Sequence, residues 1–196
     1  ITVMIHTGSR GLGHQVCSEH VKTIESNYRR KDDVWYSPKW DIEVKDRQLA
    51  SAPIHSKEGQ EYVDSMNAAG NYAFANRSAL TQKLRTVLRE TLGADSSLEV
   101  IYDVSHNIAK IEEHYIHGKK CKCCVHRKGA TRALGGDHAE LTERFRGIGQ
   151  PVLVPGDMGT ASWVLAGPKN GNNDAFASSC HGAGRRLSRT AARNSI

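Results

Sequence analysis

Three histidines lie where apolar or β-branched runs of the sequence give way to small or polar residues. His6 precedes "TGSRG", His106 lies in "YDVSHN", and His181 lies in "SSCHGAGRRLSR". Neutral imidazole near pH 7 binds metal ions, transfers protons and attacks phosphorus as a nucleophile. These positions are therefore the first candidates for chemistry in this chain.

His181 differs from the other two because glycine and arginine surround it. Residues 182–184 are Gly, Ala and Gly, which let a backbone approach a ligand closely. Arg185 and Arg189 follow and are suited to holding charge on a phosphoryl group. The pattern predicts a nucleophilic histidine in a phosphate-binding cradle. The alternative is a glycine-rich turn that leads into a basic amphipathic helix.

The turn after His6 also allows two interpretations. Ser9 and Arg10 follow in a small-residue turn, which suits an anion-binding loop or a metal ligand at a rigid strand end. A plain surface turn has the same composition, and short motifs match by chance. The sequence leaves the choice open.

His106 has a comparable place at the end of an apolar run. Asp103 and Asn107 flank it and could orient its ring. A helix that begins with Ser105 or Asn107 as its N-cap and continues through "IAKIEEH" would explain the same polar residues without any chemistry. Here too both interpretations stay open.

Two further motifs carry possible ligand groups. "PGDMGTAS" follows the apolar run "PVLV" and offers Asp157 and Ser162 to a nucleotide, although a plain β-turn has the same residues. "CKCC" suggests zinc, yet on a strand Cys121 and Cys124 point to opposite faces and cannot chelate one ion. A redox pair would need a helix after the first cysteine, so small strand residues are the favoured interpretation.

The composition narrows the class of protein. The 196 residues carry a formal charge of +6, which favours an anionic partner such as nucleic acid or nucleotide. No apolar run is long enough for a membrane span, no signal peptide opens the chain, and five cysteines form no disulfide framework. We therefore expect an intracellular, cytoplasmic protein without membrane contact.

Hydrophobic periodicity predicts both helices and strands. We expect a strand that ends at His6, a polar loop over residues 26–41, and strands over 98–104, 121–132, 151–154 and 162–167. Helices are expected at Leu12, Val16, Val21 and Ile24, after a Ser56 cap through Tyr62, Met66 and Ala69, and at Leu80, Leu84, Val87 and Leu88 before Gly93. The expected fold class is α+β, with mixed or antiparallel sheets and packed helices in a single domain over residues 1–196.

Six motifs in this order resemble the RtcB family of GTP-dependent RNA ligases. They are "HTGSRGLGHQV", "DRQLASAPIHSKEGQEYVDSMNAAGNYAFANRS", "YDVSHNIAKIEEH", "VHRKGATRA", "GQPVLVPGDMGTASWVLAG" and "SSCHGAGRRLSR". The resemblance covers nearly the whole chain. It implies joining of an RNA 3′-phosphate or 2′,3′-cyclic phosphate end to a 5′-hydroxyl end through a histidine–GMP intermediate, with GTP and Mn²⁺. tRNA splicing or RNA repair is the implied setting, and some relatives need an activating protein partner.

The resemblance also assigns roles to residues. It makes His181 the guanylylated histidine, and His6 and His106 two manganese ligands. The implied guanine-nucleotide contacts are Asn107, Pro155, Gly156, Asp157, Met158, Ser162, His181, Gly182, Ala183 and Gly184. Basic residues expected to hold RNA phosphates, without reading sequence, are Arg10, Arg127, Lys128, Arg185 and Arg189.

Some parts of the family pattern have no counterpart here. These are an upstream Asp and Cys among the metal ligands, a His in a Gly-Asn-His motif, and a distal lysine that contacts the nucleotide. We therefore expect an internal piece of a longer enzyme, with little or no ligation by this chain alone. The alternative function is a non-catalytic module that binds RNA ends or a guanine nucleotide, and a zinc-binding structural domain is a third.

Overall fold

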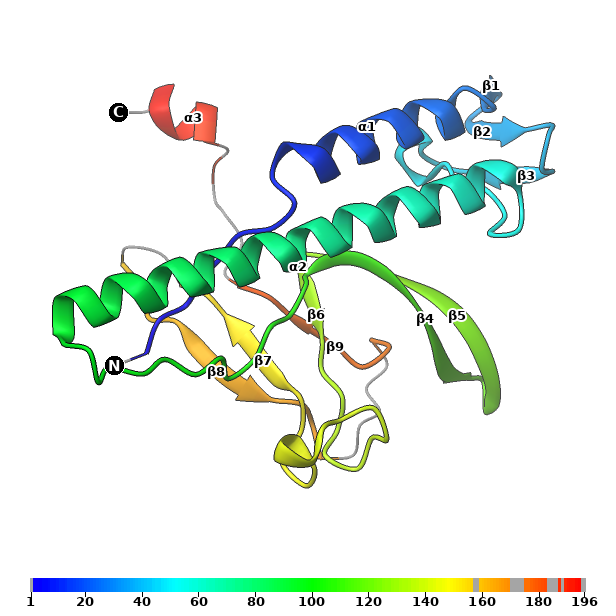
Figure 1. Ribbon diagram of the computed structural model, residues 1–196. Helices are drawn as coiled ribbons and strands as arrows, with labels where there is room; N and C mark the ends of the chain where they lie inside the picture. Colours follow the sequence, from blue (N-terminus) through cyan, green and yellow to red (C-terminus); the bar gives the residue numbers. More distant parts are fainter. Residues whose placement is uncertain (1, 157–158, 170–174, 183–186, 188, 195–196) are drawn as a thin grey trace. The chain divides into compact units, whose positions relative to one another are not determined.

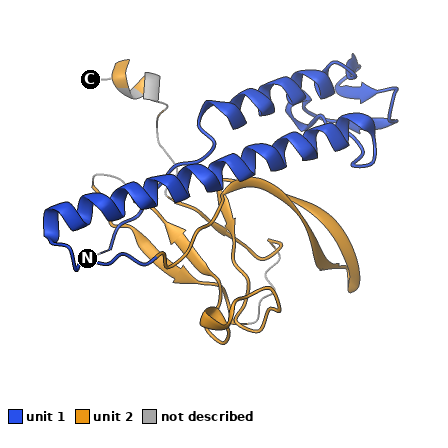
Figure 2. Ribbon diagram, viewed as in Figure 1, with its two compact units in different colours: residues 1–99 blue, residues 100–196 orange. Residues whose placement is uncertain are grey.

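The computed structural model describes residues 2–156, 159–169, 175–182, 187 and 189–194. The chain divides into two compact units, Ile1–Glu99 and Val100–Ile196, shown in different colours in Figure 2. Whether the two units act as the single domain predicted over residues 1–196 stays a prediction.

Unit 1 is built on two helices and a small sheet (Figure 1). Helix α1 spans Gly11–Glu25 and α2 spans Lys57–Leu92. The two helices pack against each other, with the His20 ring edge-on to the Tyr62 ring at 5.9 Å. A Cβ placed on Gly13 of α1 would lie 3.7 Å from the Cβ of Ala69 on α2, so small residues allow this close contact.

The predicted ends of the long helix are confirmed. The Ser56 hydroxyl accepts a hydrogen bond from the Gly59 amide at 3.1 Å, as an N-cap does, and Gly93 follows the helix with φ of 109°. The two predicted helical runs form one continuous helix of 36 residues. Ala68, Ala69, Ala73 and Ala75 lie close to Gly70 and favour the helix, so this glycine does not interrupt it.

The polar loop predicted over residues 26–41 is wrong, because two strands of a small sheet lie within it. Strands β1 (Arg29–Lys31), β2 (Val34–Ser37) and β3 (Ile42–Val44) pair antiparallel in that order, and a 3₁₀ turn, η1 (Arg47–Leu49), follows. The β-branched and aromatic residues of β2 favour a strand. The prediction gave too much weight to the charged residues of β1, which is an exposed edge strand where charges are common.

Unit 2 consists of two-stranded antiparallel pairs. Strands β4 (Asn107–Ile116) and β5 (Lys119–Lys128) form a long hairpin, and β6 (Ala130–Arg132) pairs with β9 (Ser178–Cys180). A 3₁₀ turn, η2 (Glu143–Phe145), precedes β7 (Pro151–Val154), which pairs with β8 (Trp163–Ala166); a short helix, α3, spans Arg189–Asn194. Helices and antiparallel sheets together confirm the α+β class.

The long hairpin decides between the interpretations of residues 105–113. His117 and Gly118 at its tip both have positive φ, 49° and 75°, as a two-residue hairpin turn of the primed type requires. Asn107 pairs with Lys128 at the open end of the hairpin, so the helix considered after Ser105 is wrong. Pairing with ten residues of β5 outweighs the local preference for a helix.

The predicted strands over 151–154 and 162–167 are confirmed as β7 and β8, and the one over 121–132 as β5 and β6, separated at Gly129. Residues 2–6 and 98–104 are not in strands, so those two predictions are wrong. Side-chain contacts hold the second segment instead: Arg85 donates to the Leu98 carbonyl, and Tyr102 packs edge-on against Phe145. β-branched composition alone does not make a strand, because a strand also needs a hydrogen-bonding neighbour.

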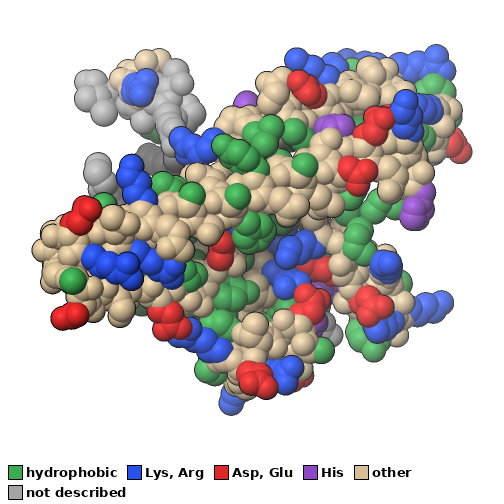
Figure 3. Space-filling view, viewed as in Figure 1, with side chains coloured by type: hydrophobic (Ala, Val, Ile, Leu, Met, Phe, Trp, Pro, Cys, Tyr) green, Lys and Arg blue, Asp and Glu red, His purple; other side chains and the backbone are tan. Residues whose placement is uncertain are grey.

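Two surface properties complete the description. No helix in the described ranges combines the length and the apolar character that a bilayer crossing requires. The space-filling view shows lysine and arginine side chains interspersed with acidic ones and not gathered into one patch (Figure 3).

Candidate functional site around His181

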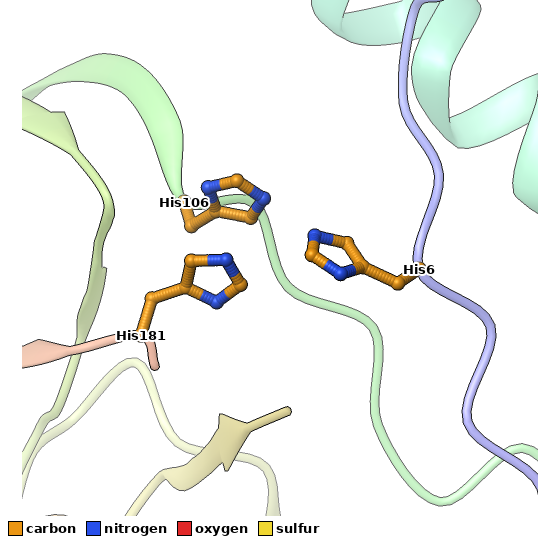
Figure 4. Close-up of side chains that lie close together, drawn as sticks. All are labelled: His6, His106 and His181. Atoms are coloured by element: carbon orange, nitrogen blue, oxygen red, sulfur yellow. The ribbon is translucent and has the colours of Figure 1, made fainter. Parts of the chain in front are cut away.

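Two of the three candidate histidines stack on each other in unit 2. The ring centroids of His106 and His181 are 3.6 Å apart and the ring planes differ by 13° (Figure 4). His106 directly precedes β4 and His181 directly follows β9, and both side chains are partly buried. Two histidines 75 positions apart in the sequence therefore share one site.

Gly129 links the two strands that carry these histidines. Its amide donates a hydrogen bond to Oδ1 of Asn107 at 2.9 Å, and its carbonyl accepts one from the His181 amide at 3.1 Å. Its φ of 67° is in the left-handed region, which glycine adopts without strain. Gly129 thus fixes the beginning of β4 next to the residue that follows β9. In the sequence this glycine lies in the motif "VHRKGATRA", where its spacing alone does not indicate this role.

The turn between β7 and β8 reaches the same place. A Cβ on Gly182 would lie 3.1 Å from the Pro155 carbonyl oxygen, so the two backbones are close. Within the turn, the Gly156 amide donates to the Ser162 hydroxyl at 3.1 Å. A Cβ on Gly156 would lie only 2.4 Å from two carbonyl oxygens of that turn, so glycine is required there. The structure thus brings Pro155, Gly156 and Ser162 together with the histidine pair.

Other predicted residues have a different status. Asp157, Met158, Ala183, Gly184 and Arg185 lie outside the described residues. Of Arg189, only its backbone at the beginning of α3 is described. The roles predicted for these six residues stay predictions.

His6 and Arg10 belong to unit 1. His6 is exposed and lies before α1, in a segment held by α2: the Asn76 amide donates to the Gly8 carbonyl at 2.8 Å. Arg10 is exposed at the N-cap position of α1, with φ of 54°. The metal site predicted for His6 with His106, and the RNA contact predicted for Arg10, stay predictions.

Arg127 was predicted to contact RNA phosphate, and the structure buries its guanidinium. Its side chain is only 2% exposed, and NH1 and NH2 donate to the two carboxylate oxygens of Glu112 at 2.7 and 2.8 Å. Nε donates to the Ser178 hydroxyl at 2.9 Å, and NH2 also donates to the Phe176 carbonyl at 2.8 Å. A guanidinium engaged in this way is not available to a phosphate in solvent. The neighbouring Lys128 is exposed, and its predicted role is compatible with that position.

Glu112 is the centre of a buried ionic network. Besides Arg127, it contacts Nε2 of His114 at 2.9 Å, and Arg132 lies 4.0 Å away and pairs with Glu140. Burial acts to raise the pKa of Glu112, but the hydrogen bonds from Arg127 and His114 and the positive charges of Arg127 and Arg132 together outweigh it, so the pKa is below its ordinary value. One local signal of this network is visible in the sequence: the Glu-x-His spacing of Glu112 and His114 places both side chains on one face of a strand.

The cysteines of β5 behave as the strand interpretation expects. The residues of "CKCC" all lie within β5, and burial raises the pKa of the Cys124 thiol. Its Sγ lies 3.9 Å from Nδ1 of His126. No cysteine in the described ranges joins a group of three side chains able to hold a metal ion, so the zinc interpretation gains no support.

The chain is thus an α+β protein in which glycine-containing turns surround a stacked histidine pair. A buried ion pair, Arg127 with Glu112, contacts the segment that leads to His181. The sequence profile of the family described as "tRNA-splicing ligase RtcB" matches residues 1–196. The chain therefore belongs to the RtcB family, and the resemblance inferred from six motifs is confirmed.

Individual relatives agree with this assignment. A "tRNA-splicing ligase RtcB" of Archaeoglobus fulgidus is 48% identical over 199 residues, which cover 100% of this chain and 39% of the relative. One from Thermococcus kodakarensis is 50% identical over 98% of this chain and 39% of its own length. The "RNA-splicing ligase RtcB" of Mycobacterium tuberculosis is 52% identical over 96% of this chain and 41% of its own length. The chain thus spans about two fifths of the length of these relatives.

Proposed function

We propose that this chain carries the guanylylated histidine of an RNA ligase. The enzyme joins RNA ends that bear a 3′-phosphate or 2′,3′-cyclic phosphate to 5′-hydroxyl ends, at the expense of GTP and with Mn²⁺. Family membership and the names of the relatives support ligation of RNA. Its setting would be tRNA splicing or RNA repair in the cytoplasm, with an activating protein as a candidate partner.

One observation carries the proposal. Of the residues that the family resemblance gives to guanine-nucleotide binding, those that the structure describes come from three separate parts of unit 2, and they lie around His181. The Asn107 side chain hydrogen-bonds the Gly129 amide, and the Gly129 carbonyl accepts from the His181 amide. The Pro155 carbonyl oxygen lies next to Gly182. Ser162 closes the turn that contains Pro155. Chance motif matches would not be expected to meet at one point in the fold.

The chemistry begins with the His181 ring. A neutral ring nitrogen attacks the α-phosphorus of GTP, a P–N bond forms, and the bond to pyrophosphate breaks. The stacked His106 ring limits rotation of His181, so the nucleophile is held in one plane.

The later steps pass GMP to the RNA. An oxygen of the RNA 3′-phosphate attacks the phosphorus bound to His181, the P–N bond breaks, and the histidine is regenerated. The 5′-hydroxyl then attacks the activated RNA phosphate, GMP leaves, and a 3′,5′-phosphodiester forms. A cyclic phosphate end is first opened by water. Positioning and electrostatics account for most of the catalysis in such phosphoryl transfers.

His6 and His106 are the residues of this chain that would hold the metal. Imidazole nitrogen is an acceptable ligand for first-row metal ions, but Mn²⁺ favours oxygen donors and six-fold coordination, so two histidines fit only part of its shell. When bound, the ion would withdraw charge from the phosphoryl oxygens. The remaining ligands would come from the upstream Asp, Cys and His of the family pattern, from substrate or from water.

The test is covalent labelling. The protein, in a form that includes the flanking family segments, is incubated with GTP labelled at the α-phosphate and Mn²⁺, and acid-labile label on the protein is measured. We expect labelling of the wild type, none of His181→Ala, and wild-type labelling of His117→Asn. His117 lies at the tip of the hairpin, and asparagine tolerates its positive φ. Equal labelling of His181→Ala would overturn the assignment of the nucleophile.

The same samples test the alternative of a non-catalytic module. Such a module would bind RNA with an affinity that falls steeply with salt, because phosphate contacts dominate. It would give neither labelled protein nor ligated RNA with any metal ion. That result would replace the ligase by an RNA-end or guanine-nucleotide binding protein.

A further inference from the structure

We propose that Arg127 is a positioning residue for His181, held by Glu112 so that it fixes the strand leading to the histidine. This inference rests on the proposed function only where it concerns GMP transfer. In place of the RNA contact predicted for it, Arg127 would hold the backbone segment that precedes His181.

The contacts of Arg127 span three elements. From β5, its guanidinium reaches Glu112 on β4, the Ser178 hydroxyl at the beginning of β9, and the Phe176 carbonyl just before β9. The pairing with Glu112 is bidentate, which fixes the plane of the guanidinium. Nε donates to the Ser178 hydroxyl and NH2 donates a second bond to the Phe176 carbonyl, so both groups face the segment before His181. The ion pair therefore connects the hairpin to β9.

Strand β9 depends on such a connection because it is short. It has three residues, Ser178–Cys180, and it pairs only with β6 among the described strands. At its far end, the His181 amide donates to the Gly129 carbonyl. Arg127 and Gly129 are two positions apart, so one short stretch of chain holds the segment 176–181 at both ends. Moving either attachment would move His181 against His106.

His114 makes a second connection between Glu112 and the segment before β9. His114 contacts Glu112 at 2.9 Å and places its ring edge-on to Phe176, with 5.2 Å between ring centroids. Phe176 and Ala177 both have positive φ, 54° and 48°, so the backbone before β9 is held in an uncommon conformation. Glu112, His114 and Arg127 together surround this strained approach to His181. A surface ion pair would not be expected to have such partners.

The substitution Arg127→Lys separates positioning from charge. Lysine keeps the positive charge next to Glu112, but its single ammonium cannot keep a bidentate pair and also reach both Ser178 and Phe176. Gln150→Met is the matched control. Gln150 is a buried polar residue of the same unit, and its side chain hydrogen-bonds the Leu134 amide and Tyr102.

Three readouts decide the matter. The first is the urea midpoint of unfolding, which should fall in both variants. The second is the NMR ring-proton shift of His181, which stacking on His106 displaces; it should move toward the value in His106→Ala for Arg127→Lys only. The third is GMP labelling, where we expect kcat for Arg127→Lys to fall by about 100-fold with little change in KM for GTP, as for a misplaced reacting group. Gln150→Met should keep a wild-type kcat.

Two results would overturn the inference. One is an unchanged His181 ring shift in Arg127→Lys. The other is a loss of kcat that Gln150→Met reproduces at the same loss of stability, since Arg127 would then only stabilise the fold. The ring shift needs no nucleotide. If no protein is labelled by GTP, the ligase proposal fails, and the NMR comparison still decides whether Arg127 positions His181.

Discussion

Replacement of Glu112 by glutamine should destabilise the protein at neutral pH and hardly at all in acid. At neutral pH the variant leaves the Arg127 cation buried, with neutral hydrogen-bond acceptors in place of a carboxylate. Removing one partner of a buried ion pair commonly costs about 3–5 kcal/mol. Glutamine still offers one acceptor, so we expect a loss near the lower end, about 3 kcal/mol in the free energy of unfolding.

The pH dependence follows from the lowered pKa of Glu112. Above the pKa of an unfolded glutamate, about 4.3, the carboxylate is charged in both states and its full contribution is present. As the pH falls through the lower pKa of the folded state, Glu112 is protonated and that contribution is lost. The wild type then resembles the variant, and the difference between them disappears.

Urea unfolding of both proteins at several pH values between about 7 and 3 measures this difference. Glu113→Gln is the control, because Glu113 is an exposed neighbour on β4 that pairs with Lys120 at the surface. It should change stability little at any pH. The reasoning is refuted if Glu112→Gln is as stable as the wild type at neutral pH, or if its deficit persists unchanged in acid.

Three smaller predictions concern other parts of the chain. Gly156→Ala should reduce the rate of GMP labelling more than ten-fold, because the new Cβ meets two backbone oxygens of its turn. A ten-fold loss corresponds to about 1.4 kcal/mol of transition-state stabilisation, and an unchanged rate would contradict the close packing. Ser56→Ala should cost about 1 kcal/mol in thermal or urea unfolding, since α2 loses its N-cap bond, and an unchanged midpoint would contradict the cap. Timed alkylation followed by mass spectrometry should modify the exposed Cys17 and Cys180 before Cys124, whose pKa burial raises; the opposite order would contradict that burial.

Helix α1, the Ser56 cap and Gly93 at the end of α2 could all be predicted from the sequence. The hydrogen bonds and caps of a helix connect residues at most a few positions apart, so the relevant pattern is visible in one stretch. Strands β7 and β8 were predicted too, because proline and glycine limit two short apolar runs.

The strands predicted before His6 and before Ser105 show where this reasoning stops. Both stretches have β-branched residues, but they are not in strands. The charged stretch of β1, by contrast, is part of a sheet. A strand exists only if another segment supplies its hydrogen bonds, and a single stretch of sequence does not name that segment.

The sequence by itself determined the family and the helices α1 and α2, and it predicts His181 as the nucleophile. Only the tertiary structure decided that His106 stacks on His181, that Gly129 ties their strands together, and that Arg127 is buried against Glu112. On sequence grounds Arg127 was grouped with the exposed cations, because arginine is usually at the surface. Its burial depends on a carboxylate fifteen positions away across a hairpin, and such a pairing is set by strand register and not by local composition.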